Sequence, residues 1–392
     1  MAATGPGSRR DLAPLEVVGR LERLRRLFGT AGEDGPADGT GALGGLLVTT
    51  PANIRWLTGF TGSAALLLVT RHRALLTTDG RYRAQSGEQL AAAGVDGAVE
   101  TTIGGIVAQR DALVGGAGRG VLGLEADHVT WAAQRSFDEL FSGSTLVATK
   151  GLVERLRTVK DAGEVARMER AASIADDALG SVLPLLAAAG SGAGDDLTEA
   201  RFAAALDDAM RQRGADGSAF ETIVASGENS AKPHARPGRR RIQPGDPVVV
   251  DFGAVFDGYR SDMTRTFCVG GEPRGELATV FEVVASSQRT GVGAVRPGVA
   301  TGEVDSACRQ VIAAAGWAER FEHGTGHGVG LDIHEGPSVG PGSTAILVPG
   351  TVVTVEPGVY LPGTGGVRIE DTLVVTDSGS RPLTRFPKEV AV

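Results

Sequence analysis

The chain has 392 residues, of which 42% are hydrophobic and 22% charged, with a formal net charge of −8. This length suffices for two domains with their own cores, and the composition is that of a soluble globular protein. The acidic balance argues against a nucleic-acid partner. No run approaches the roughly 20 apolar residues of a membrane span, so no membrane partner is expected. Two cysteines, Cys268 and Cys308, make no disulfide framework, which favours a cytoplasmic location.

The N-terminal part of the chain alternates predicted strands and helices. Residues 1–12 are interpreted as a loose tail, and residues 13–28 carry apolar side chains at helical spacing. Strand-like and helical segments then follow one another to about residue 148. This alternation predicts an α/β domain over residues 13–151.

From Leu152 onward the pattern changes to long amphipathic helices followed by many strands. A helix is predicted to begin near Asp161, a fair N-cap, and another to span Leu197–Arg213. After Phe220 the segments are mostly strands, interrupted by two helical stretches. We therefore assign residues 152–392 to a second domain of the α+β type.

The segment 248–267 predicts a hairpin that carries two carboxylates on one face. Its Asp257-Gly258 pair lies between β-branched and aromatic residues, which is the strongest local signal for a type I′ turn. That turn sets Asp251 opposite Thr264 and makes Asp251 and Asp262 diagonal neighbours, ~7–8 Å apart at the backbone. Such carboxylates repel each other unless a cation lies between them, so a metal site is suggested. From this stretch alone, a solvated face of a surface hairpin is the alternative.

Three histidines, His323, His327 and His334, lie within twelve residues of one glycine-rich segment. The many glycines make a helix implausible, so the segment is predicted to be a loop and a strand edge. It contains no His-Glu-x-x-His motif, which excludes the zincin arrangement.

Two further acids stand in strand-like segments. Glu356 ends the strand TVVTVE, and Glu370 lies in the middle of the predicted strand GVRIEDTLVV. Each alone is explained as an exposed strand residue. Four carboxylates and one imidazole together suit two divalent ions with shared ligands; the set is Asp251, Asp262, His327, Glu356 and Glu370.

These blocks resemble the creatinase, prolidase and aminopeptidase P family, whose catalytic domain has the pita-bread fold. The resemblance covers roughly residues 45–392, and its motifs occur in the family's order. They are FETIVASGENSAKPH (220–234), VVVDFGAVFDGYRSDMTRTF (248–267), HGTGHGVGLDIHEGP (323–337), TVVTVEPGVY (351–360) and GVRIEDTLVV (366–375). A smaller creatinase-type α/β domain is implied for the N-terminal part.

The resemblance implies a role for each residue of the site. Asp251 would bind one metal ion, His327 and Glu356 the other, and Asp262 and Glu370 would bridge the two. Glu356 would also shuttle the proton of a metal-bridged hydroxide. The remaining matches would contact the substrate: His234 and His334 at the scissile carbonyl, and His323 at the proline pocket. Arg368 would both contact the substrate and support the carboxylates.

The implied reaction is hydrolysis of an X–Pro bond at the N-terminus of a peptide by a homodimer with two divalent ions, expected to be Mn²⁺, with Co²⁺ or Zn²⁺ as alternatives. Three other functions remain open. They are an X–Pro dipeptidase (prolidase), a metal-free amidinohydrolase, and a non-catalytic binding module on the same fold. The retention of all five ligands argues against the last two.

Overall fold

The computed structural model describes residues 11–29, 42–191 and 196–392, which form two compact units. One unit comprises residues 15–157, and the other comprises residues 158–392 with the residues before Leu15. Most of the predicted tail, residues 1–12, lies outside the described residues. The helix at residues 152–157 falls in the first unit, whereas the sequence pattern predicted that it belongs to the second domain.

The N-terminal unit is built on one six-stranded sheet of order β4-β3-β2-β1-β5-β6. Strand β2 is antiparallel to both of its neighbours, and the outer pairs are parallel. The elements are α1 (Arg20–Arg26), β1 (Gly45–Val48), α2 (Pro51–Thr58), β2 (Ala65–Thr70), β3 (Ala74–Thr78), α3 (Arg83–Ala92), β4 (Glu100–Ile103), α4 (Ile106–Ala117), β5 (Val121–Glu125), α5 (Trp131–Leu140), β6 (Thr145–Thr149) and α6 (Leu152–Arg157), with 3₁₀ turns η2 (Leu27–Gly29) and η3 (Gly80–Tyr82).

The first helix is shorter than predicted. Its apolar spacing suggested a start at residue 13, but α1 begins at Arg20. The preceding Gly19 has a φ of 87°, a left-handed conformation that a continuing right-handed helix does not contain.

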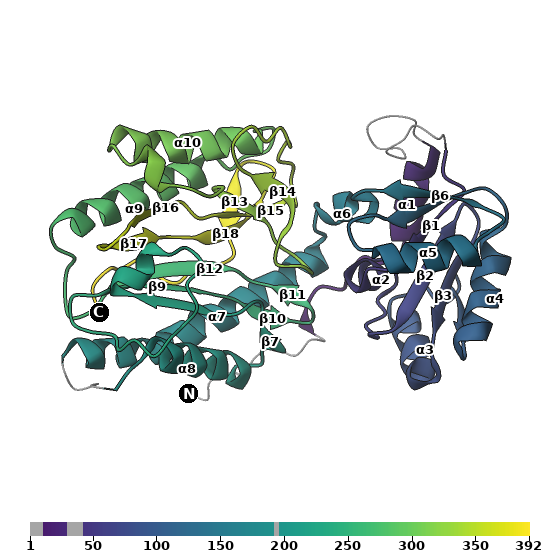
Figure 1. Ribbon diagram of the computed structural model, residues 1–392, viewed down its shortest axis with the longest axis horizontal. Coiled ribbons are helices and arrows are strands. Elements are labelled where there is room, and N and C mark those ends of the chain that lie inside the picture. The colour runs from purple at the N-terminus through teal and green to yellow at the C-terminus, as the bar shows by residue number, and fades with distance from the viewer. Residues whose placement is uncertain (1–10, 30–41, 192–195) are drawn as a thin grey trace. The chain divides into compact units, whose positions relative to one another are not determined.

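The larger unit consists of strands backed by two pairs of helices (Figure 1). Its elements are α7 (Ala162–Gly190), α8 (Glu199–Gln212), β7 (Gly217–Ser218), β8 (Ile223–Ser226), η4 (Gly227–Ala231), β9 (Pro247–Phe252), β10 (Ala254–Phe256), β11 (Tyr259–Arg260), β12 (Met263–Cys268), α9 (Glu276–Ala294), α10 (Thr301–Ala314), η5 (Ala318–Arg320), β13 (Gly326–Gly328), β14 (Glu335–Val339), β15 (Val352–Val355), β16 (Gly358–Leu361), β17 (Gly365–Arg368), β18 (Asp371–Val375) and β19 (Ser380–Pro382).

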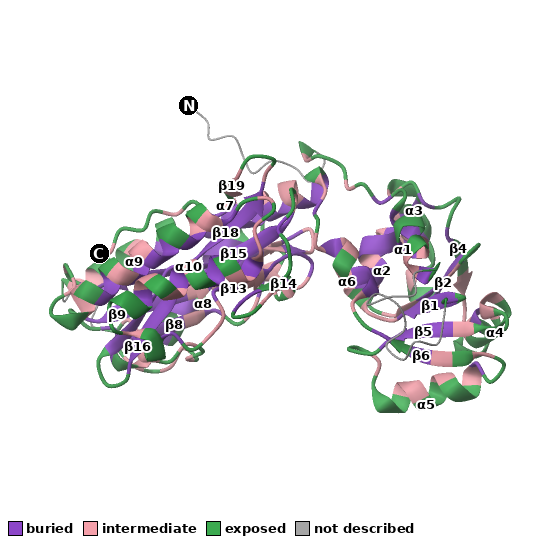
Figure 2. Cartoon of the chain, turned by 90° about the horizontal axis from the view of Figure 1, so that it is seen from above, coloured by how far each residue is buried: buried purple, intermediate pink, exposed green. Residues whose placement is uncertain are grey.

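Each pair of helices covers one half of the strands in this unit. Helices α7 and α8 lie along β9 and β10, and α9 and α10 lie along β15 to β17 on the other side (Figure 1). The strands β15 and β18 are buried along their whole length, while the helices expose one face (Figure 2). Two helix-backed halves therefore meet through their strands, which is the pita-bread arrangement that the sequence predicted.

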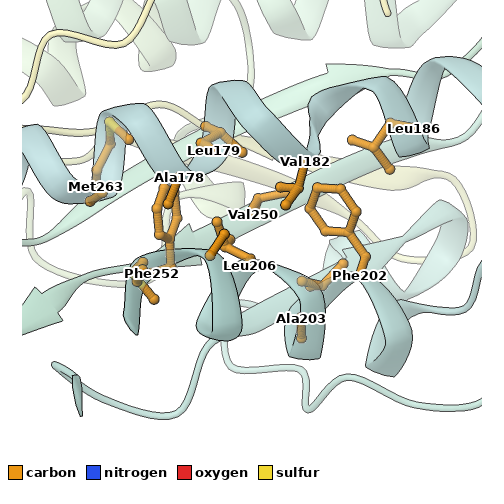
Figure 3. Packing of buried hydrophobic residues seen from close by; sticks show 14 of the residues in the cluster. Ala178, Leu179, Val182, Leu186, Phe202, Ala203, Leu206, Val250, Phe252 and Met263 are labelled. Carbon is orange, nitrogen blue, oxygen red and sulfur yellow. The ribbon is translucent and has the colours of Figure 1, made fainter. Parts of the chain in front are cut away.

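Two hydrophobic clusters fill the two halves. In the first, Phe202 and Leu206 of α8 and Leu179 of α7 pack against Val250 and Phe252 of β9 (Figure 3). The second joins α9 and α10 to β15, β16 and β17.

Helix α7 has the length and hydropathy of a membrane-crossing segment. Its residues Ala171, Ile174, Ala178 and Leu179 nevertheless have no exposed surface and belong to the first cluster of the larger unit. Its N-terminus is fixed as predicted by Asp161, which forms a capping box with Glu164. These contacts are those of a core helix.

The predicted hairpin register is confirmed. Thr264 lies opposite Asp251, and the turn residues Asp257 and Gly258 have φ values of 46° and 75°. A type I′ turn requires positive φ at both positions, which is why this dipeptide sets the pairing of the flanking strands.

The prediction of one continuous strand around Glu370 is wrong. Residues 365–368 form β17 and pair with β16, whereas residues 371–375 form β18 and pair with β15 and β19. Glu370 lies between these two strands, where its N–H donates to the carbonyl of Thr264 at 3.1 Å. The chain thus leaves one sheet and enters another at Glu370, which aims this side chain at the hairpin.

Candidate metal centre

Five side chains that the sequence proposed as metal ligands converge where strands of the two halves meet. Asp251 comes from β9 and Asp262 precedes β12, while His327 comes from β13, Glu356 follows β15 and Glu370 links β17 to β18. All five line one cleft. Ligand atoms of Asp262, His327 and Glu370 lie within 4.8 Å of one another.

The ring of His327 is oriented so that one nitrogen faces the carboxylates. Its Nδ1 lies 3.0 Å from the carbonyl of Gly328, and a carbonyl can only accept, so Nδ1 carries the proton. Its Nε2 lies 3.5 Å from Asp262 Oδ2 and 3.4 Å from Glu356 Oε1. Burial lowers the pKa of His327 to about 4, which keeps the ring neutral and leaves the Nε2 lone pair available to a metal ion.

The carboxylates are costly to hold together in their ionised form. Burial raises the pKa of Glu356 to about 8. Burial also raises the pKa of Asp262 and Glu370 well above their usual range, and the repulsion of neighbouring carboxylates adds to it. A bound cation would remove this penalty, because it favours the charged form of every acid in the cluster.

Two buried carboxylate oxygens lack any partner within the described part of the chain, namely Asp251 Oδ1 and Glu370 Oε1. The other oxygen of each acid is engaged. Arg368 Nη2 donates to Asp251 Oδ2 at 2.5 Å, and Thr264 Oγ1 donates to Glu370 Oε2 at 2.7 Å. Buried acceptors are rarely left unsatisfied, so each acid keeps one oxygen for a ligand of opposite charge. The residues therefore fit divalent metal ions.

Arg368 ties the centre to the surrounding chain. Besides Asp251, its guanidinium donates to Tyr360 Oη at 2.9 Å, to Thr264 Oγ1 at 3.2 Å and to the carbonyl of Pro233 at 3.2 Å. The sequence predicted both support of the carboxylates and substrate contact for Arg368. Its donors here go to protein atoms, and it lines the cleft wall.

The cleft above the carboxylates has a volume of about 650 Å³. The three histidines predicted to contact substrate, His234, His323 and His334, all line it. The ring of His334 packs edge-on against that of His327, with centroids 4.4 Å apart. Apolar side chains complete the walls and include Phe220, Ile223, Pro233 and Ile333.

Both ring nitrogens of His323 are engaged by the protein. Nδ1 lies 2.8 Å from the carbonyl of Gly324 and Nε2 lies 2.9 Å from Tyr360 Oη. Burial lowers its pKa to about 4, so the ring is neutral. His323 thus offers the cleft an uncharged ring surface, which suits the proline pocket that the resemblance implied. Tyr360 was not singled out from the sequence, although it lies in the same block as Glu356.

The glycines around His327 allow close packing of backbone. A Cβ on Gly326 would collide with the carbonyl oxygen of Thr354, whose hydroxyl accepts the N–H of His327 at 3.0 Å. The same hydroxyl donates to Glu356 Oε1 at 3.2 Å. Gly326 therefore lets two of the proposed ligands, His327 and Glu356, share one hydrogen-bonding neighbour.

Comparison with known proteins agrees with this geometry. A sequence profile for the metallopeptidase family M24 matches residues 166–377, and one for the creatinase/prolidase N-terminal domain matches residues 20–159. The chain belongs to the metallopeptidase family M24. It is a hydrolase of a family that works with divalent metal ions, and the family resemblance and fold class expected from the sequence are confirmed.

Three similar proteins match most of the chain. It is 41% identical over 374 residues to the uncharacterized peptidase YqhT of Bacillus subtilis, covering 95% of this chain and 99% of that protein. The solved Xaa-Pro dipeptidase from Bacillus anthracis has a TM-score of 0.87 at 36% identity and covers 96% of this chain and 100% of that chain. The X-Pro aminopeptidase from Thermotoga maritima has a TM-score of 0.79 at 32% identity, covering 89% and 98% respectively.

Proposed function

We propose that this M24 metallopeptidase is an Xaa-Pro aminopeptidase, which releases the first residue of peptides that have proline second. The similar structures named for X–Pro cleavage support the choice of bond. An X–Pro amide lacks an N–H and has a fixed φ, so it resists hydrolysis by peptidases that bind the scissile N–H. A site built from carboxylates and histidines requires no donor from the scissile amide.

The ligands would hold two divalent ions, and we propose Mn²⁺ because oxygen donors outnumber nitrogen. Such ions lower the pKa of bound water and polarise a carbonyl. Glu356 would accept a proton from the attacking water and pass it to the leaving proline nitrogen. His334 and His234 line the cleft where they can donate hydrogen bonds to the carbonyl oxygen as negative charge develops on it.

One observation favours longer peptides over dipeptides. A dipeptidase must bind the free carboxylate of proline, most simply through an arginine that forms a bidentate pair. Among the residues that the structure describes, the arginines lining the cleft are Arg236 and Arg368. Arg368 is committed to Asp251, and Arg236 is an exposed side chain 3.3 Å from Glu221. Neither guanidinium is therefore both buried and uncommitted, as a bidentate partner for the carboxylate of proline would have to be.

The preference is tested by comparing kcat/KM for Ala-Pro, Ala-Pro-Ala and the amide Ala-Pro-NH₂ with the metal-loaded enzyme. Ala-Ala-Ala serves as the control for the requirement for proline. We expect cleavage of the tripeptide and the amide at rates at least equal to that of the dipeptide. Cleavage of Ala-Pro alone would make the protein a dipeptidase, and equal cleavage of Ala-Ala-Ala would refute X–Pro specificity.

A further inference from the structure

The segment of residues 227–238, named here the His234 loop, forms one wall of the cleft. It joins β8 to the chain that leads into β9, and it contributes Pro233, His234, Arg236 and Pro237 to the lining. The ring of His234 is exposed at the tip of a turn, where Ala235 N–H donates to the carbonyl of Lys232 at 3.2 Å. Its position therefore depends on how the two ends of the loop are held.

One buried carboxylate holds both ends. Glu199, the first residue of α8, has no exposed surface. At the start of the loop, its Oε1 accepts the N–H and the hydroxyl of Ser226, each at 2.8 Å, and the side-chain amide of Asn229 at 3.1 Å. At the end of the loop, its Oε2 accepts the N–H of Gly238 at 3.0 Å.

Backbone hydrogen bonds around Glu199 also hold the end of the His234 loop, near Gly238. The N–H of Glu199 donates to the carbonyl of Arg240 at 3.1 Å, and the N–H of Ala200 donates to the carbonyl of Gly238 at 3.0 Å. Arg240 pairs with Asp246 at 2.5 Å and donates to Ser226 Oγ at 2.7 Å. Arg240 thus adds a charged contact to this anchor.

The far side of the loop is tied to the metal centre. The carbonyl of Pro233, next to His234, accepts from Arg368, and Arg368 also donates to the metal ligand Asp251. The His234 loop is therefore held at two places. The Glu199 carboxylate binds both ends of the loop, and the Arg368 guanidinium binds the carbonyl of Pro233 next to His234.

We infer that Glu199 is a positioning residue for the reaction, acting through His234. This inference rests on the proposed function, in which His234 contacts the carbonyl oxygen of the substrate. With the base of the loop anchored, the ring is held where charge develops in the transition state, and no reorganisation is required during the reaction. Glu199 itself does not line the cleft, so it touches neither substrate nor metal ion.

The variant Glu199→Gln separates this role from simple packing. It keeps the size of the side chain and one acceptor for Ser226, but it places an amide N–H₂ against the N–H of Gly238. Both groups are donors, so the hydrogen bond that holds Gly238 at the end of the loop is lost. We expect kcat on Ala-Pro-Ala to fall about tenfold, with KM and bound metal unchanged, because His234 acts on the transition state rather than on binding.

The same substitution in a His234→Ala background tests the route of the effect. If Glu199 acts through His234, the second substitution causes no further loss of kcat. Hydrogen–deuterium exchange gives a readout that needs no substrate, and E199Q should raise exchange in residues 227–238. Glu164→Gln is the matched control, since Glu164 is another buried glutamate in the first turn of a helix of the same unit. It should leave both kcat and exchange in the His234 loop unchanged.

Any one of three results would overturn the role of Glu199. They are an unchanged kcat in E199Q, a fall in kcat in the His234→Ala background as large as that caused by E199Q alone, and unchanged hydrogen exchange in the loop. If E199Q does not fold, Asn229→Ala removes a single contact with the anchor and must lower kcat in the same direction, and an unchanged kcat there overturns the inference. Absence of X–Pro hydrolysis in the unmodified enzyme would instead refute the proposed function. The exchange measurement would still test the anchoring of the loop, because it needs no activity.

Discussion

Replacing Glu356 by glutamine should stabilise the metal-free protein and destabilise the metal-loaded protein. The side chain of Glu356 is 17% exposed and lies beside other acids, and its partial burial raises its pKa from 4.5 to about 8. Glutamine has nearly the same shape and carries no charge. The substitution therefore removes the cost of ionising this group when no cation is present, and it removes a ligand when one is.

The effect on metal-free stability depends on pH with a definite sign. Between pH 4.5 and 8 the folded state retains the Glu356 proton that the unfolded state has released, so the stability of the unmodified protein falls as pH rises through this interval. Glutamine does not titrate. The advantage of E356Q should therefore be absent near pH 4.5, grow with pH, and level off above pH 8.

The size of the effect follows from the same pKa. At about 1.4 kcal/mol per pH unit, a rise from 4.5 to about 8 corresponds to an upper bound of roughly 5 kcal/mol above pH 8. Relaxation of the site and water entry reduce this bound, so we expect a gain of about 2–3 kcal/mol in the free energy of unfolding at pH 8.5.

The assay is urea unfolding followed by circular dichroism at several pH values between 5 and 8.5, first with chelator and then with Mn²⁺. Since the chain has two compact units, the transition that Mn²⁺ shifts is the one to analyse. Glu282→Gln, on an exposed position of α9, is the control and should change stability by less than about 0.5 kcal/mol. A metal-free E356Q less stable than the unmodified protein at pH 8.5 would refute the reasoning.

Three further outcomes are expected. Chelation should abolish X–Pro hydrolysis and Mn²⁺ or Co²⁺ should restore it, whereas full activity with no metal by elemental analysis would exclude a metal mechanism. Asp262→Ala and Glu370→Ala should each lose bound metal, while His334→Ala should keep its metal and lose at least tenfold in kcat; normal metal content and turnover in Asp262→Ala would contradict the ligand assignment. Gly326→Ala should lower stability by about 2 kcal/mol or more, because its Cβ meets the carbonyl of Thr354; an unchanged midpoint in urea unfolding would show that the strand can shift.

The parts of the site that the sequence predicted are those set by local geometry. The Asp257-Gly258 turn fixes the register of its own hairpin, so the relation of Asp251 to Thr264 could be worked out from the order of residues alone. Likewise, the dense glycines around His327 are by themselves enough to exclude a helix. Each of these conclusions depends on backbone preferences that act over a few residues.

The break at Glu370 shows where local reasoning fails. Its neighbours have the alternation of one continuous strand, but residues before and after it pair with different sheets. A strand pattern records which side chains are buried and does not record which partner covers them. Only the packing of the two halves reveals that the chain changes sheets at Glu370.

The order of residues was enough to predict the hairpin register and the family, both of which are confirmed, and to propose the ligand set. Packing was needed to show which carboxylate oxygens lack a partner, that burial raises the pKa of Glu356, and that Tyr360 Oη lies 2.9 Å from His323 Nε2. It also revealed Glu199, whose position at a helix start gave no sign of contact with the His234 loop. The physical reason is that desolvation and hydrogen bonding between distant segments arise only when those segments are packed together, whereas turn and strand preferences act between near neighbours in the chain.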